Sequence, residues 1–201
     1  GESEYGGRVL SEEHQMKRDF TEVLENYVGD DPLNWETEEV SIADLAPYIY
    51  PSPEKLASSP VTSYYFGYFF PWSVKENYEF IKTKVAFKCH PNGRTPGTFT
   101  DYDSLDDKID GLYYYMQFIK FGFGRASRDA SRLIHNGQLS RDEGLKLAGK
   151  FEDEFPSEHF NEVLDFLDLD FAEFTEVVDS HRNPEIWAKE GQHWTLKFPL
   201  V

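Results

Sequence analysis

The stretch Ser104–His135, "SLDDKIDGLYYYMQFIKFGFGRASRDASRLIH", decides the expected fold, because two helical patterns meet in it at a glycine turn. Apolar side chains recur in its first half at steps of four, three, four and three residues: Leu105, Ile109, Leu112, Met116 and Ile119. This spacing places them on the core face of a helix over 105–121. Gly122 and Gly124 permit a tight turn. The next helix then has its own core face, made of Ala126, Ala130, Leu133 and Ile134.

The flanking sequence predicts a mostly helical chain with one short β element. Ser73 with Glu76, and Ser140 with Glu143, have the spacing of capping boxes, so helices should begin there, the first running to about residue 84. The Asn-Gly pair at 136–137 should end the helix before the second box. "VTSYYFGYFF" (61–70) is β-branched and aromatic between two prolines, and it predicts the strand.

Composition excludes several classes of protein. The 201 residues contain 37 Asp and Glu against 20 Lys and Arg, a net charge of −17, which argues against a broad nucleic-acid surface. The lone cysteine, Cys89, excludes an internal disulfide and a Cys-based zinc site. No apolar run approaches the roughly 20 residues of a membrane span, and no signal peptide is present. We therefore expect a cytoplasmic protein.

Five aspartates crowd the segment 100–111, "TDYDSLDDKIDG". An EF-hand loop beginning at Asp101 would need Gly at its sixth position and Glu at its twelfth, where this chain has Asp106 and Leu112. Ser104, with Asp107 three residues later, predicts a helix cap, and acids suit a first helical turn. Capping leaves three aspartates unexplained: Asp101, Asp103 and Asp110.

Two further patterns carry charge. A polar stripe borders the core stripe at Asp106, Asp110, Tyr113, Gln117 and Lys120, and it lines a cleft or faces solvent. Six Lys and Arg lie between residues 108 and 141 against two acids, Asp110 and Asp129. We call these six the basic island: Lys108, Lys120, Arg125, Arg128, Arg132 and Arg141. Beside a glycine turn and a helix N-terminus, such a cluster predicts a phosphate or carboxylate site, or a salt-bridge network.

Three segments together resemble a known family: "GESEYGG" (1–7), "YYFGYFFPWSVKENYEF" (64–80) and "GTFTDYDSLDDKIDGLYYYMQFIKFGFGRASRDASRLIHNGQLSRDEGLKLAGKFEDEFP" (97–156). They look like the C-terminal half of N-acetyl sugar amidotransferases, which belong to the PP-loop ATP pyrophosphatase superfamily and act in lipopolysaccharide O-antigen and other surface-polysaccharide biosynthesis. The resemblance implies the helical C-terminal part of an α/β, adenine nucleotide alpha hydrolase-like protein. Residues 1–70 would end the nucleotide-binding domain, and 71–201 would form a helical substrate-binding domain.

The family implies a reaction with ATP and Mg²⁺. ATP adenylates the oxygen of a sugar N-acetyl group, and ammonia displaces AMP to leave an acetamidino group. The ammonia would come from a glutaminase subunit through a cyclase-like, ammonia-channelling subunit. The acceptors would be nucleotide-linked sugars similar to diacetamido uronic acids. The PP-loop motif, of the type Ser-Gly-Gly-x-Asp-Ser, does not occur in these residues. We therefore expect the ATP-binding half upstream of Gly1 and this chain to be a fragment.

Chemistry, combined with this resemblance, assigns candidate roles. The catalytic candidates are Asp110, Lys120 and Arg125. The acceptor sugar, its anionic groups or a Mg²⁺ ion would contact Thr100, Asp101, Asp106, Tyr113, Asp129 and Arg132. The loop at the nucleotide would contain Glu4, Tyr5, Gly6 and Gly7. Two alternatives stay open. The chain could be a non-catalytic docking module that uses the acidic segment 151–180, or a PP-loop ATP pyrophosphatase with another acceptor, such as tRNA.

Overall fold

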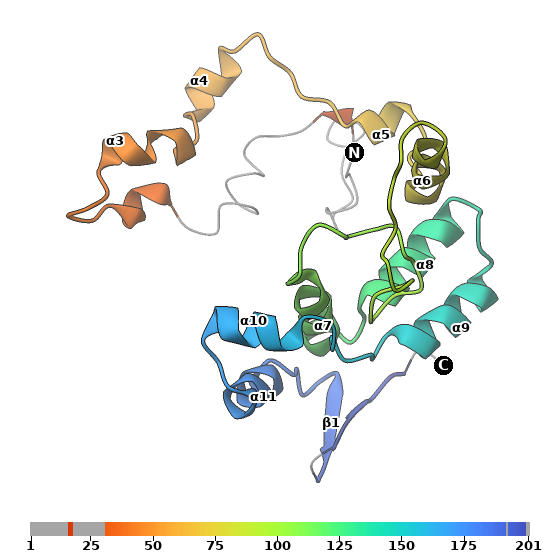
Figure 1. Ribbon diagram of the computed structural model, residues 1–201. Helices are drawn as coiled ribbons and strands as arrows, with labels where there is room; N and C mark the ends of the chain where they lie inside the picture. Colours follow the sequence, from red (N-terminus) through yellow and green to blue (C-terminus); the bar gives the residue numbers. More distant parts are fainter. Residues whose placement is uncertain (1–15, 18–30, 192, 200–201) are drawn as a thin grey trace. The chain divides into compact units, whose positions relative to one another are not determined.

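The computed structural model describes residues 16–17, 31–191 and 193–199, and the chain divides into two units, Gly1–Trp72 and Ser73–Val201 (Figure 1). The predicted class is confirmed, because the described chain is mostly helical with one small antiparallel sheet. No helix among the described residues is long and apolar enough to cross a membrane.

The described part of the first unit contains short helices only. They are η2 (Pro32–Trp35), α3 (Ile42–Leu45), η3 (Ala46–Tyr48), α4 (Pro53–Ala57) and α5 (Phe66–Phe69). Side chains cap three of them: Asp31 caps η2, the Ser41 hydroxyl forms a capping box with Asp44 at α3, and Ser52 caps α4.

The strand predicted over 61–70 is wrong. This segment holds helix α5 and a single antiparallel bridge between Lys17 and Tyr64. Phe66 and Phe70 stack one helical turn apart, with ring centroids 4.6 Å from each other, and both side chains are more than half exposed. Aromatic residues favour strands where a pleated surface is half-buried. This segment has no such surface, so the i, i+4 contact of a helical turn prevails.

The second unit contains the longer elements. They are α6 (Val74–Lys82), α7 (Asp110–Phe121), α8 (Arg125–His135), α9 (Arg141–Phe151), α10 (Phe160–Leu167), α11 (Phe171–Ser180), β1 (Trp187–Glu190) and β2 (His193–Leu196). Ser73 caps α6, and Ser140 forms the predicted capping box with Glu143 at α9. α8 ends immediately before the Asn-Gly pair, as predicted.

Helix α7 begins at Asp110 and not at Leu105, which corrects the predicted cap. Ser104 has a left-handed backbone, with φ 56°, and its hydroxyl bonds to the Asp110 carboxylate instead of to a helical amide. Asp107 accepts from the Ile109 amide at 2.9 Å and so forms a turn before the helix. The aspartate-rich segment is therefore a loop that leads into α7.

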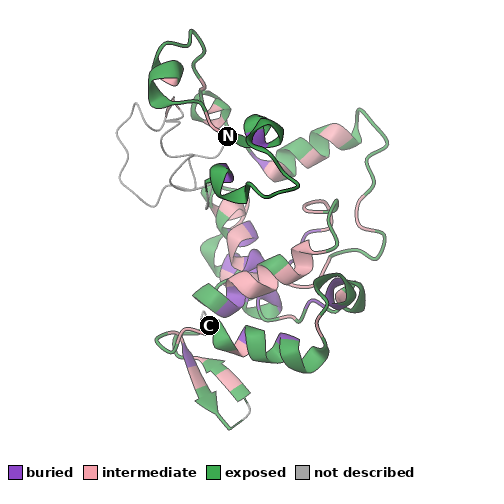
Figure 2. Ribbon diagram, turned by 90° about the vertical axis from the view of Figure 1, so that its left-hand side faces the viewer, coloured by how far each residue is buried: buried purple, intermediate pink, exposed green. Residues whose placement is uncertain are grey.

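The core of the second unit joins α7, α10, α11 and the hairpin. Its buried side chains are Phe118, Ile119, Leu164, Phe174, Val178 and Trp187, drawn purple in Figure 2. The Trp187 indole donates to the Ile119 carbonyl at 2.7 Å and packs edge-to-face on Phe118. In the hairpin, β1 pairs antiparallel with β2 in the register Trp187 opposite Leu196. This core fixes α7 and, through the turn at Gly122, the start of α8.

Helices α8 and α9 lie side by side (Figure 1). Gly144 of α9 is buried against Ile134 and Ala130 of α8, and a Cβ added there would come within 2.6 Å of Ile134. The absence of a side chain lets the two helices approach closely. The end of α9 is thereby brought next to the start of α8.

Candidate functional site

The loop over residues 94–104 is fastened to Glu154, just after the end of α9. The Arg94 guanidinium binds Glu154 through two parallel hydrogen bonds, of 2.6 and 2.8 Å, and the Gly97 amide donates to the same carboxylate at 3.0 Å. Burial acts to raise the pKa of Glu154, but Arg94 and the Gly97 amide outweigh it and hold that pKa below its usual value. The loop therefore has a fixed attachment at its first half.

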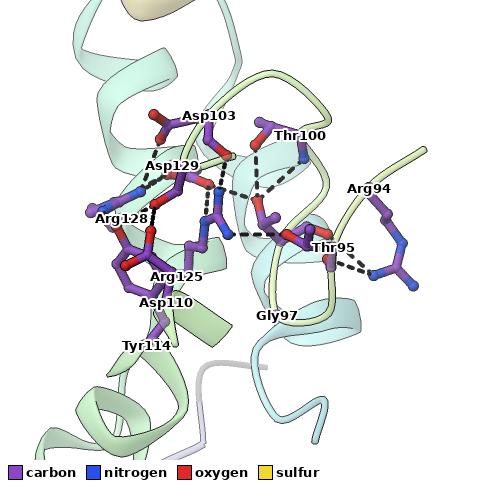
Figure 3. A network of polar contacts seen from close by, with 12 residues as sticks. Arg94, Thr95, Gly97, Thr100, Asp103, Asp110, Tyr114, Arg125, Arg128 and Asp129 are labelled. Carbon is purple, nitrogen blue, oxygen red and sulfur yellow. Dashed lines mark hydrogen bonds and ion pairs between the residues drawn. The ribbon is translucent and has the colours of Figure 1, made fainter. Parts of the chain in front are cut away.

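Arg125, the first residue of α8, fastens the second half of the loop (Figure 3). Its side chain is only 2% exposed, and it donates to the Thr95 hydroxyl at 3.0 Å and to the Asp103 carbonyl at 2.5 Å. Its Nε lies 3.8 Å from a carboxylate oxygen of Asp129, one helical turn further on. Arg125 thus donates its hydrogen bonds to the protein's own loop.

Asp129 is the anion at the centre of this arrangement (Figure 3). It is 6% exposed, accepts from the Thr98 hydroxyl at 2.6 Å, and pairs with Arg128 at 2.9 and 3.1 Å. Arg128 also bonds to Asp103 and to the Tyr114 hydroxyl. Burial acts to lower the pKa of Arg128, whereas Asp129 and Tyr114 raise it, and the net shift is upward. We call this set the internal network: Thr98, Asp103, Tyr114, Arg125, Arg128 and Asp129.

The N-terminus of α8 already holds an anion that belongs to the protein. The buried Glu152 carboxylate accepts from the Gly124 amide and, at 2.8 Å, from the Ser127 amide. These are the free amides at which a phosphate binds to a helix N-terminus. Glu152 therefore occupies the position that the glycine turn suggested for a bound anion.

The basic island does not form one surface in the second unit. Arg125 and Arg128 belong to the internal network, and Lys108 pairs with Glu162 at 2.5 Å. Lys120 and Arg141 are exposed on other elements. Arg125 and Arg128 therefore form a salt-bridge network, which was the alternative to a phosphate or carboxylate site in the sequence analysis.

A cavity of about 480 Å³ lies beside the predicted aspartates, between three loops of the second unit. Its walls come from the segments 90–96, 104–111 and 156–159, with Arg125 at the start of α8. We call it the acidic cavity, because its lining has four carboxylates against two permanent cations: Asp106, Asp107, Asp110 and Glu158 against Lys108 and Arg125. It brings together three of the predicted site residues, Asp106, Asp110 and Arg125.

Two residues of this cavity were not predicted. The His90 Nε2 atom lies 3.0 Å from a carboxylate oxygen of Glu158, and the Asn92 amide lies 3.3 Å from the His90 Nδ1 atom. His90 and Glu158 are far apart in the sequence and follow no helical or metal-binding spacing. No local pattern therefore connects them, and only the folded chain shows them as a pair.

The other predicted residues lie elsewhere. Asp101 is half-buried, and its carbonyl accepts from the His90 amide at 2.8 Å. Tyr113 is 63% exposed and lines neither cavity described here. Lys120 is ten residues after Asp110 in α7, about 15 Å along the helix axis at 1.5 Å per residue. Three others line a separate cavity of about 20 Å³, which has room for roughly one water molecule: Thr100, Asp129 and Arg132. The predicted nucleotide loop lies outside the described residues: Glu4, Tyr5, Gly6 and Gly7.

The carboxylates do not form a metal site of their own. Among the described residues, no group of three or more His, Cys, Asp or Glu side chains is arranged to hold a metal ion. Mg²⁺ that accompanies a nucleotide usually takes only one or two carboxylates, together with waters and the substrate's phosphates. The Mg²⁺ ion therefore stays a prediction.

Comparison with known proteins agrees with the resemblance seen in the sequence. The family described as "LPS biosynthesis protein WbpG-like, C-terminal domain" matches residues 96–198, slightly more than half of the chain. No curated protein matches the chain. The matched residues include the internal network, helices α7 to α11, the hairpin and most of the lining of the acidic cavity. The chain belongs to the family of WbpG-like lipopolysaccharide biosynthesis proteins, whose C-terminal domain it contains.

Proposed function

We propose that the chain is the C-terminal portion of an ATP-dependent N-acetyl sugar amidotransferase of O-antigen biosynthesis, and that the acidic cavity receives the acceptor sugar. The enzyme would convert an acetamido group into an acetamidino group with ammonia. Membership of a lipopolysaccharide biosynthesis family supports the biosynthetic role. The reaction and the position of the sugar are the proposal.

The observation that supports the proposal best is the excess of negative charge in the lining of the acidic cavity. The reaction turns a neutral amide into an amidine, which is a cation at neutral pH. Carboxylates beside the acetamido group favour the developing positive charge over the neutral substrate, and this preference for the transition state is the requirement for catalysis. Asp106, Asp110 and Glu158 provide such a wall. Carboxylate oxygens also accept hydrogen bonds from sugar hydroxyls.

The size of the cavity and its exposed cation fit the rest of the substrate. About 480 Å³ lies within the range of roughly 300–1,000 Å³ that is usual for small-molecule sites. The carboxylate wall would repel the phosphates of a nucleotide-linked sugar, so we place them toward Lys108, whose side chain is 62% exposed. In this proposal ATP is a second substrate, and the ammonia comes from a glutaminase subunit through a cyclase-like subunit.

The test is an assay of the complete protein that contains this chain. We expect AMP release that requires both ammonium and a nucleotide-linked diacetamido uronic acid. Asp110→Asn should lower kcat/KM by at least about 100-fold, because it removes a charge that faces the forming cation. The control is Asp165→Asn, the same change at an exposed residue of α10. AMP release without any need for the sugar, or full activity of Asp110→Asn, would contradict the proposal.

One observation favours the docking alternative. Phe166 and Phe171 are 79% and 63% exposed on α10 and α11, within the segment 151–180 that has eleven acids and no Lys or Arg. A partner with a basic, apolar face would complement this surface. Docking predicts binding that weakens steeply with salt and that Asp110→Asn does not change. Salt-sensitive binding of the ammonia-supplying subunits, without any ammonia-dependent AMP release from the complete protein, would favour docking. AMP release that Asp110→Asn lowers would favour the enzyme.

A further inference from the structure

The pair of His90 and Glu158 in the acidic cavity has a defined direction of hydrogen bonding. The Asn92 backbone amide can only donate, so the His90 Nδ1 atom, 3.3 Å away, accepts. A neutral imidazole then carries its proton on Nε2 and donates it to the Glu158 carboxylate, 3.0 Å away. The imidazole therefore fixes one carboxylate oxygen of Glu158.

The second oxygen of Glu158 has no hydrogen bond from the described residues, and the side chain is 27% exposed where it lines the cavity. The other inward carboxylate is differently placed, because Asp110 accepts a hydrogen bond from the Ser104 hydroxyl. His90 itself is only 13% exposed, which restricts the orientation of the pair. Glu158 thus combines a fixed position with an oxygen that can accept a proton.

We propose that Glu158 is the general base that takes a proton from the attacking ammonia, and that His90 is the residue that positions it. This inference rests on the proposed function. The ammonia nitrogen adds to the acetamido carbon, whose oxygen carries the adenylyl group, and a C–N bond forms. One proton leaves that nitrogen for the free oxygen of Glu158. The C–O bond then breaks, its electron pair leaves with AMP, and the amidinium group remains.

Charged groups on each wall act on this proton transfer. Lys108, Arg125 and His159 also line the cavity, as do Asp106, Asp107 and Asp110. The aspartates favour a positive charge on the nitrogen before it loses its proton, and the Glu158 carboxylate then accepts that proton. Removing this carboxylate should therefore slow the reaction with free ammonia.

The experiment measures kcat/KM for free ammonia in the complete protein, with AMP release as the signal. Glu158→Gln should lower it by about 100- to 10,000-fold. KM for the nucleotide-linked sugar should change by less than about threefold. Glu190→Gln, the same change at an exposed residue of β1, serves as the control and should match the unmodified protein.

Two variants at His90 test its positioning role separately. His90→Gln retains an N–H donor near the position of Nε2 and should keep most of the activity. His90→Ala removes the donor and should lower the rate on ammonia while the melting temperature stays close to that of His90→Gln. If Glu158→Gln fails to fold, this pair decides between a positioning role and none.

The outcomes separate the two proposals. An active unmodified protein with equal activity in Glu158→Gln and Glu190→Gln overturns the role of Glu158 and leaves the proposed function in place. Equal rates on ammonia in His90→Gln and His90→Ala overturn the positioning role. A complete protein without any ammonia-dependent AMP release overturns the proposed function and this inference together.

Discussion

The internal network and the acidic cavity use similar residues for opposite purposes. In the internal network each charged side chain is paired within the protein and is less than a third exposed. In the acidic cavity, four carboxylates face an open volume with two permanent cations. Arg125 takes part in both, since it closes the network and lines the cavity. Charged side chains that are buried and paired within the protein stabilise the fold, whereas carboxylates that face an open volume form a candidate binding site. The density of charge in the sequence does not distinguish the two.

The largest expected effect on stability follows the loss of the central anion of the network. Asp129→Ala leaves Arg125 and Arg128 without their shared carboxylate, and removing one partner of a buried ion pair costs about 3–5 kcal/mol. Asp106→Ala, at an exposed residue of the acidic cavity, should change the free energy of unfolding by less than about 0.5 kcal/mol. Urea unfolding of both variants measures the difference. Equal losses would contradict the distinction between the two regions.

A smaller effect is expected at the carboxylate that caps α8. Glu152→Ala leaves the Gly124 and Ser127 amides without their acceptor in a buried place, which costs about 1–3 kcal/mol. Hydrogen exchange at these two amides should become faster, together with a lower midpoint of urea unfolding. Glu176→Ala is the matched control on a solvent-exposed face. If added phosphate restored the stability of Glu152→Ala, the helix terminus would be an anion site that Glu152 normally fills.

The negative charge of the network should also raise the pKa of a neighbouring tyrosine, Tyr102. Burial, and then the charges of Asp129, Asp103 and Asp101, raise the pKa of Tyr102 from 10.0 to about 12. Because the folded-state pKa lies above the unfolded one, the stability linked to this proton is complete below pH 10 and is lost as pH rises through 12. Tyr102→Phe should flatten the decline of the unfolding midpoint over this range. An unchanged decline would show that Tyr102 is not in the field of the network.

The smallest effect is expected at the exposed cation of the cavity. Glu162 pairs with Lys108, and this hydrogen bond holds the pKa of Glu162 below its usual value. Both side chains are about 60% exposed, so solvent and salt screen the attraction. Glu162→Gln should leave the midpoint of urea unfolding unchanged at physiological salt. A clear loss of stability would indicate that Lys108 has a structural role instead of being available to a phosphate.

Local signals in the sequence predicted part of the fold correctly. The capping serines fix the starts of α6 and α9, and the Asn-Gly pair marks the end of α8, because these signals involve residues within one turn of each other. The start of α7 was misplaced, since Ser104 bonds to Asp110 six residues later. The hairpin was missed although Trp187–Glu190 and His193–Leu196 flank a glycine. Its Trp187 is held by α7, at a great distance along the chain.

The candidate site was predictable to a similar extent. Helical spacing put Asp106 and Asp110 on one polar stripe, and the structure places both at the acidic cavity. Arg125 was identified by its charge, but its burial and its bonds to the loop depend on tertiary contacts that no spacing encodes. His90 and Glu158 come from the same two segments that Arg94 and Glu154 hold together. Sequence patterns identify chemistry within one element, and not the pairs that folding creates between loops.

The central claim is that the acceptor sugar binds in the acidic cavity and not at the basic island. Hydrogen exchange of the complete protein, with and without a nucleotide-linked diacetamido uronic acid, tests it most directly. We predict slower exchange in the segments 90–111 and 156–159, with little change along Arg125–His135. Slower exchange confined to residues 120–132, with the cavity segments unaffected, would contradict the claim.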